Sequence, residues 1–176
     1  NSEVQLDLPN LGVILVGNNP ASESYVKNKI KACERAGIKH TLTKLPTDIT
    51  QDDLIRVINQ MNNDDSITGF IVQLPLPNSI NTQKILEAID PAKDADGLHP
   101  MNLGRLVAGY DSLLPCTPSG IIELLRHYQV PIARSEVVVI GRGLTVGRPL
   151  SLMLSRKSEN ATVTLAHTGT RDLAKL

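Results

Sequence analysis

Residues 136–147 read EVVVIGRGLTVG and residues 161–166 read ATVTLA. The first stretch begins as a short apolar strand and runs into a glycine-rich turn, and the second is another strand. A helix between them completes one βαβ unit, in which the backbone N–H groups of the turn and the helix dipole favour an anion such as a pyrophosphate. A plain tight turn is the alternative, because Gly147 comes one position later than the third glycine of G-x-G-x-x-G.

The rest of the chain alternates strands and helices. The predicted strands are residues 11–17, 39–45 and 68–73, and the predicted helices are residues 20–36, 52–61, 85–89 and 120–128. We expect the first helix to end at Gly37, in the left-handed conformation, and the last helix to begin at Thr117-Pro118. This alternation predicts an α/β fold, a parallel sheet with helices on both faces. A proline-bearing polar stretch near residues 115–120 divides it into two expected domains, residues 1–116 and 117–176.

Composition excludes several classes of function. The 176 residues are 41% hydrophobic and 20% charged with a formal net charge of +0, so no basic surplus points to nucleic acid or to an anionic membrane. The longest apolar run, residues 11–16, is far shorter than the ~20 residues that span a bilayer, and no signal peptide opens the chain. Cys33 and Cys116 resemble neither a disulfide framework nor a metal site. We therefore expect a cytoplasmic protein without a metal.

One lysine of the first helix differs from its neighbours. Tyr25 and Lys29 are four residues apart and share a face, with Ser22 one turn earlier, and an apolar stripe that includes Val26 runs beside them. A lysine at the edge of burial has its charged form disfavoured by desolvation, which suits an acid or base near neutral pH. The alternative is an ordinary solvated lysine.

Gln73 and Asp96 come at the carboxyl side of their segments, where open α/β sheets hold ligands. Pro75 and Pro77 stiffen the chain after Gln73, so its side-chain amide can be aimed. In the alternatives, Gln73 only ends a strand and Asp96-Gly97 is an ordinary turn.

The end of the last strand bears on the cofactor. Residues 167–171 read HTGTR, and no acid precedes Asp172, whereas NAD sites have a carboxylate here for the ribose hydroxyls. The side chain of Arg142 can also reach the side of the site at which this strand ends. Hydroxyl and cationic groups without a carboxylate predict NADP.

Six ordered motifs resemble one known family. They are YVKNK at 25–29, QLPLP at 73–77, PAKDADG at 91–97, PCTPSG at 115–120, GRGLTVGRP at 141–149 and ATVTLAHT at 161–168. The chain resembles the bifunctional methylenetetrahydrofolate dehydrogenase/methenyltetrahydrofolate cyclohydrolases over nearly its whole length. The resemblance implies oxidation of 5,10-methylenetetrahydrofolate by NADP, hydrolysis of the methenyl cation to 10-formyltetrahydrofolate, and a homodimer.

The resemblance also implies roles for individual residues. Lys29 would be the acid/base of the hydrolysis, Tyr25 would pack on the folate, Gln73 would hydrogen-bond to Lys29, and Asp96 would hold the pterin-like ring. Ser22, Leu74 and Pro75 complete the expected substrate-binding set. Arg142 and Thr168 would contact the 2′-phosphate. The expected cofactor-binding residues are Gly141, Arg142, Gly143, Thr145, Val146, Gly147, His167 and Thr168.

The chain also departs from the family pattern. Gly143 and Thr168 stand where many members of the family have serine. Gly143 removes a hydroxyl from the phosphate turn, whereas Thr168 keeps one. The chain opens without methionine and ends before the family's P-G-G-V-G-P motif, and we therefore expect a longer native protein. A catalytically silent folate- or nucleotide-binding piece or paralogue is the alternative function. Another NADP dehydrogenase of similar build is disfavoured by Lys29 and QLPLP.

Overall fold

The computed structural model describes residues 8–176, which divide into two compact units, residues 8–95 and residues 96–176. The sequence predicts a boundary between the functional domains at residue 116 instead. The helix that fills much of the interval, α4 (Pro100–Ala108), shares the core of the second unit through Leu106. The extent of the folate-binding part stays a prediction.

The first unit is built on a three-stranded parallel sheet. Its strands are β1 (Asn10–Val16), β2 (Lys39–Leu45) and β3 (Gly69–Val72), in the order β2-β1-β3. In the register of the sheet, Val13 of β1 lies beside Leu42 of β2 and Ile71 of β3. The predicted strands are confirmed to within a residue at each end. β1 is central, which explains its continuous apolar run.

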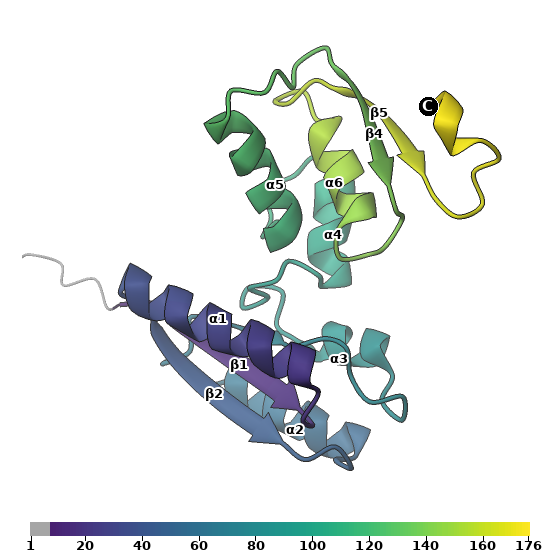
Figure 1. The fold of residues 1–176 in the computed structure, drawn as a ribbon. Helices are drawn as coiled ribbons and strands as arrows, with labels where there is room; N and C mark the ends of the chain where they lie inside the picture. The colour runs from purple at the N-terminus through teal and green to yellow at the C-terminus, as the bar shows by residue number, and fades with distance from the viewer. Residues whose placement is uncertain (1–7) are drawn as a thin grey trace, which may run out of the picture. The chain divides into compact units, whose positions relative to one another are not determined.

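Helix α1 (Pro20–Ala36) covers one face of this sheet (Figure 1). The Asn19 side chain caps its first turn, and Gly37 ends it in the left-handed conformation at φ 68°, as predicted. Val26 of α1 joins Val13, Leu15 and Ile71 in one buried cluster. The apolar stripe of the helix therefore lies on the sheet.

Helix α2 (Gln51–Asn62) lies behind the sheet, on the face opposite α1 (Figure 1). Successive side-chain positions of a strand alternate between the two faces of the sheet. The side chain of Val13 lies on the α1 face, so residue 12 is on the opposite face. A Cβ on Gly12 would lie 2.7 Å from the Cβ of Phe70 and 3.3 Å from the Sδ of Met61 on α2. α3 (Thr82–Ala88) contacts α2. Helices on both faces confirm the predicted architecture.

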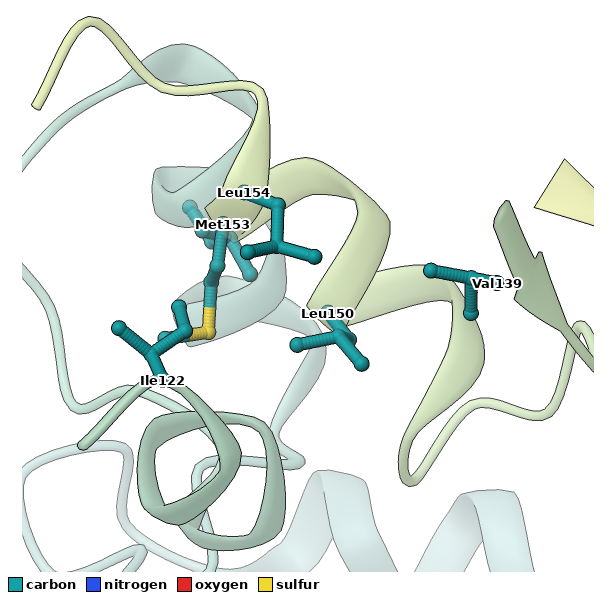
Figure 2. Packing of buried hydrophobic residues seen from close by; sticks show 6 residues of the cluster. Ile122, Val139, Leu150, Met153 and Leu154 are labelled. Carbon is teal, nitrogen blue, oxygen red and sulfur yellow. The ribbon is translucent and has the colours of Figure 1, made fainter. Parts of the chain in front are cut away.

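The second unit contains the predicted βαβ unit. Strands β4 (Glu136–Ile140) and β5 (Thr162–Ala166) pair in parallel, and α6 (Gly147–Leu154) connects them. α6 contacts α4 and α5 (Cys116–His127), and a short 3-10 helix, Leu173–Lys175, follows β5. Figure 2 shows the core between these elements, where Ile122, Met153 and Leu154 meet.

Three elements differ from the prediction. α3 begins at Thr82, three residues earlier than the predicted helix of residues 85–89, and ends at Ala88. α4 lies where no helix was expected; it begins at Pro100, and the Nδ1 of His99 accepts a hydrogen bond from the N–H of Met101. α5 begins at Cys116 rather than Gly120, so Thr117 is not its cap. A proline is tolerated throughout the first helical turn, where N–H groups have no intrahelical acceptor, and Pro118 therefore did not mark the first residue.

Among residues 8–176, no helix is both long enough and apolar enough to cross a bilayer.

Candidate active site

One flank of α1 carries three of the predicted site residues. Ser22 is buried, Lys29 is half-buried and Tyr25 is 65% exposed. The opposite flank faces β2, because Glu23 lies 3.8 Å from the Nζ of Lys44 on that strand. Since β1 lies between β2 and β3, the flank with Lys29 is on the β3 side of the helix.

Gln73 follows directly on β3. Its backbone N–H donates to the carbonyl of Ile14 at 2.9 Å, and its Nε2 donates to the carbonyl of Leu74 at 2.7 Å. The Oε1 atom is buried and has no hydrogen-bond partner among residues 8–176. A buried oxygen without a donor costs about 1–3 kcal/mol, so it is a natural acceptor for a cation or a ligand N–H.

The segment after Gln73 leaves the sheet. The Leu74–Pro75 peptide bond is cis, Leu74 is half-buried and Pro75 is exposed. Because proline has no N–H, Pro75 and Pro77 cannot extend the ladder of β3. The chain is therefore stiff where it carries the side chain of Gln73.

Asp96 is the first residue of the second unit and is half-buried. Its carbonyl accepts from the N–H of Cys116 at 3.3 Å. The next residue, Gly97, has φ 69°, and a Cβ there would lie 2.4 Å from the carbonyl carbon of Leu114. The turn after Asp96 thus requires glycine, because a side chain at residue 97 would collide with the backbone of Leu114.

The glycine-rich turn between β4 and α6 has a physical reason for its longer spacing. The N–H of Gly141 donates to the carbonyl of Ala166 at 2.8 Å, and the N–H of Arg148 donates to the carbonyl of Gly143 at 3.1 Å. A Cβ on Gly147 would lie 1.9 Å from the carbonyl oxygen of Gly141. The turn folds back on itself, and glycine is needed one position later than the usual motif has it.

The start of α6 is open to an anion. Val146 occupies its N-cap position, and no side chain of the described chain caps this end. Thr145 before it is exposed and Gly147 is the first helical residue. The start of a helix carries a partial positive charge, which suits a phosphate.

The segment after β5 lies beside this turn. The Nε2 of His167 is 3.2 Å from the Nη1 of Arg142, and Thr168 is exposed. Asp172, the first acid after β5, pairs with Lys175 at 2.9 Å. The segment after β5 therefore brings an imidazole beside the cation of Arg142, which follows β4.

Sequence reasoning missed Asn19 and Thr170, which shape the site without belonging to its motifs. Asn19 accepts hydrogen bonds from Ala21 and Ser22 and so orients the start of α1; the Asn-Pro pair at 19–20 was a usable signal. The hydroxyl of Thr170 accepts from the N–H of His167 at 2.9 Å, and no sequence pattern indicated that bond.

Two family models match the chain. The catalytic domain of tetrahydrofolate dehydrogenase/cyclohydrolase matches residues 1–96, and the NAD(P)-binding domain of the same family matches residues 115–176. The chain belongs to this dehydrogenase/cyclohydrolase family. The resemblance of the sequence motifs and the two-part α/β fold are thereby confirmed.

Solved structures agree with the family assignment. The chain is 48% identical to the bifunctional FolD dehydrogenase/cyclohydrolase of Campylobacter jejuni, with a TM-score of 0.88 over 93% of this chain and 57% of that one. The methylenetetrahydrofolate dehydrogenase of the silkworm Bombyx mori is 37% identical, with a TM-score of 0.89 over 92% of this chain and 58% of that one. The chain thus spans little more than half the length of these two relatives.

A third solved relative contains ligands. It is the FolD dehydrogenase-cyclohydrolase of Trypanosoma brucei in complex with NADP cofactor and inhibitor, and it is 38% identical. Its TM-score is 0.86 over 93% of this chain and 55% of that one.

Proposed function

We propose that the protein oxidises 5,10-methylenetetrahydrofolate with NADP and hydrolyses the resulting methenyl cation to 10-formyltetrahydrofolate. Membership of the dehydrogenase/cyclohydrolase family supports both activities. The hydrolytic half rests on the buried Oε1 of Gln73, which has no hydrogen-bond partner among residues 8–176. It lies at the end of β3, the strand toward which the Lys29 flank of α1 lies.

In the proposed hydrolysis, Lys29 moves the proton. Water adds to the methenyl carbon, and a proton must leave that water and reach a ring nitrogen before the C–N bond breaks. The Oε1 of Gln73 accepts a hydrogen bond from the Lys29 amine and so keeps the amine directed at the reacting carbon. Because the Nε2 of Gln73 is already engaged with Leu74, the amide can turn only its oxygen toward the lysine.

Other side chains bind and orient the substrate in this proposal. Tyr25 is largely exposed on the same flank, so its ring is available to stack on the flat pterin. Asp96 accepts hydrogen bonds from the N–H groups of that ring. Leu74 and Pro75 offer a stiff apolar wall, and Ser22 supports the start of the flank.

The dehydrogenation needs alignment more than proton transfer. NADP accepts the hydride when it is bound, and the one-carbon bridge becomes a cation stabilised by its two nitrogens. The protein's part is to hold two rings in register and to exclude water. Lys29 therefore matters less for this step than for the hydrolysis.

The turn after β4 fits a dinucleotide. Gly147 lets the helix start approach the backbone of Gly141, and the positive end of the α6 dipole, which no side chain of residues 8–176 caps, suits the pyrophosphate. Gly143, Thr145 and Val146 line this start. Arg142, His167 and Thr168 supply donors for a 2′-phosphate, which favours NADP over NAD.

The substitution Lys29→Met tests the proposal. We expect hydrolysis of methenyltetrahydrofolate to fall at least about a hundredfold, because the acid/base group is lost, while NADP reduction by methylenetetrahydrofolate partly survives. Both rates are measured spectrophotometrically. Lys31→Met, two residues along the same helix and exposed, is the matched control and should keep both activities.

Equal survival of both activities in Lys29→Met would remove Lys29 from its role. If the unsubstituted protein binds folate or nucleotide but catalyses neither reaction, the silent-paralogue alternative is correct. A Gln73→Leu variant should resemble Lys29→Met, because it deletes the acceptor that holds the amine.

We also propose a cytoplasmic homodimer. Both cysteines are thiols in the structure, which suits a reducing compartment. The dimer rests on family resemblance, and light scattering of the purified protein tests it directly.

A further inference from the structure

We propose that Lys93 is a positioning residue for substrate binding, because its side chain ties the segment that leads into Asp96 to the end of α2. The proposed function gives Asp96 of the PAKDADG motif a role and leaves Lys93 without one. The inference rests on that proposed function, in which the Asp96 carboxylate accepts hydrogen bonds from the pterin-like ring.

The amine of Lys93 binds two backbone carbonyls at the end of α2. Its Nζ donates to the carbonyl of Met61 at 3.1 Å and to the carbonyl of Asp64 at 2.7 Å. The last carbonyls of a helix have no intrahelical donor, and the helix dipole places a partial negative charge there. A charged amine therefore suits this position. Because both acceptors belong to the backbone, they cannot turn away as side chains can.

The main chain of the same segment binds β3. The N–H of Phe70 donates to the carbonyl of Lys93 at 2.8 Å, and the N–H of Ala95 donates to the carbonyl of Phe70 at 3.2 Å. A Cβ on Gly69 would lie 3.3 Å from the carbonyl oxygen of Lys93, so the segment passes close to the strand. Lys93 is thus bound to the sheet by its backbone and to α2 by its side chain.

These bonds fix the point at which the backbone reaches Asp96. Only two residues separate Lys93 from Asp96. Asp94 is 1% exposed, and Ala95 is hydrogen-bonded to β3. The same strand leads directly into Gln73, so β3 holds both segments that carry proposed folate ligands. Without the amine the segment keeps its bonds to β3 alone, and the Asp96 carboxylate samples more positions.

Steady-state kinetics of Lys93→Met test the positioning role. Methionine keeps an apolar stem and deletes the amine. We expect the KM for 5,10-methylenetetrahydrofolate to rise about tenfold, because the lost hydrogen bonds free Asp96, while kcat falls less than about threefold and the KM for NADP is unchanged. In Lys93→Arg the guanidinium can donate to the same carbonyls, and the KM should stay within about twofold of the unsubstituted value.

Two control variants separate positioning from stability. Lys84→Met removes an exposed lysine of α3 and should leave the KM unchanged. Thr50→Ala removes the cap at the opposite end of α2, where the Thr50 Oγ1 accepts from the N–H of Asp53 at 3.1 Å. It should lower the urea midpoint of unfolding without raising the KM. A rise in KM for Thr50→Ala as large as that for Lys93→Met would overturn the positioning role.

Hydrogen exchange followed by NMR reads these contacts without turnover. We expect the amides of Phe70 and Ala95 to exchange about tenfold faster or more in Lys93→Met, and at the unsubstituted rate in Lys93→Arg. Equal protection of the two amides in Lys93→Met would overturn the inference. An unsubstituted protein that turns over no folate would instead overturn the proposed function, whatever the exchange rates of these amides.

Discussion

Gly147 shows how a single missing methyl group determines the shape of the nucleotide-binding turn. Its hydrogen points at the carbonyl oxygen of Gly141, where a Cβ would be only 1.9 Å away. The contact is with backbone, which cannot swing aside as a flexible side chain does. The sequence analysis treated the late glycine as a weakness of the motif, and the structure explains it as a requirement of the longer turn.

Gly147→Ala should therefore destabilise the protein by more than about 1 kcal/mol and weaken nucleotide binding, because the turn must open to admit the methyl group. Urea unfolding and nucleotide titration measure the two effects. Gly120→Ala on α5 is the control: nothing in the described chain lies within 4 Å of its Cβ position, so the helix should gain about 0.5–1 kcal/mol. Equal stability of the two variants would contradict this explanation.

The residue that sequence reasoning could only half predict is Gln73. Its position after a strand and before two prolines was visible in the sequence. The burial of its Oε1 atom, with no donor among residues 8–176, was not visible, because burial depends on how the folded chain packs.

At the scale of elements, α1 is the helix on which the proposed hydrolysis depends. It carries Tyr25 and Lys29, and it meets the sheet through Val26. Its bounds followed from the sequence because both ends have local signals, a proline at the start and Gly37 at the end. α4 was missed because its cap is His99, an uncommon capping residue, and because a charged loop precedes it.

Asn19→Ala should remove two hydrogen bonds to the first turn of α1 and cost about 1 kcal/mol of unfolding free energy. The loss frees the end of the helix that carries Ser22, so we also expect a higher KM for folate. Asn19→Asp keeps an acceptor and should preserve both values. If Asn19→Ala is as stable as the unsubstituted protein, the cap does not stabilise α1.

At the scale of the whole molecule, each compact unit has its own hydrophobic core. Val13, Leu15 and Ile71 contribute to one, and Ile122 and Leu154 contribute to the other. Separate cores are the usual property of structural domains that open independently.

Leu154→Ala should show this independence. Leu154 is 1% exposed, and its truncation should cost about 2–5 kcal/mol in its own core. In hydrogen exchange we expect faster exchange across residues 96–176 and little change across residues 8–95. Val13→Ala is the reciprocal variant, and uniform acceleration by either substitution would mean that the chain opens as one unit.

The sequence by itself determined the α/β class, the parallel strands, the bounds of α1 and α2 and the family, because periodicity, caps and motifs are local signals carried by neighbouring residues. Only the tertiary structure decided which flank of α1 faces β3, that the Oε1 of Gln73 is left without a donor, and that His167 is held by a turn beside Arg142. These features depend on atoms far apart in the chain, whose distances and burial no local pattern encodes.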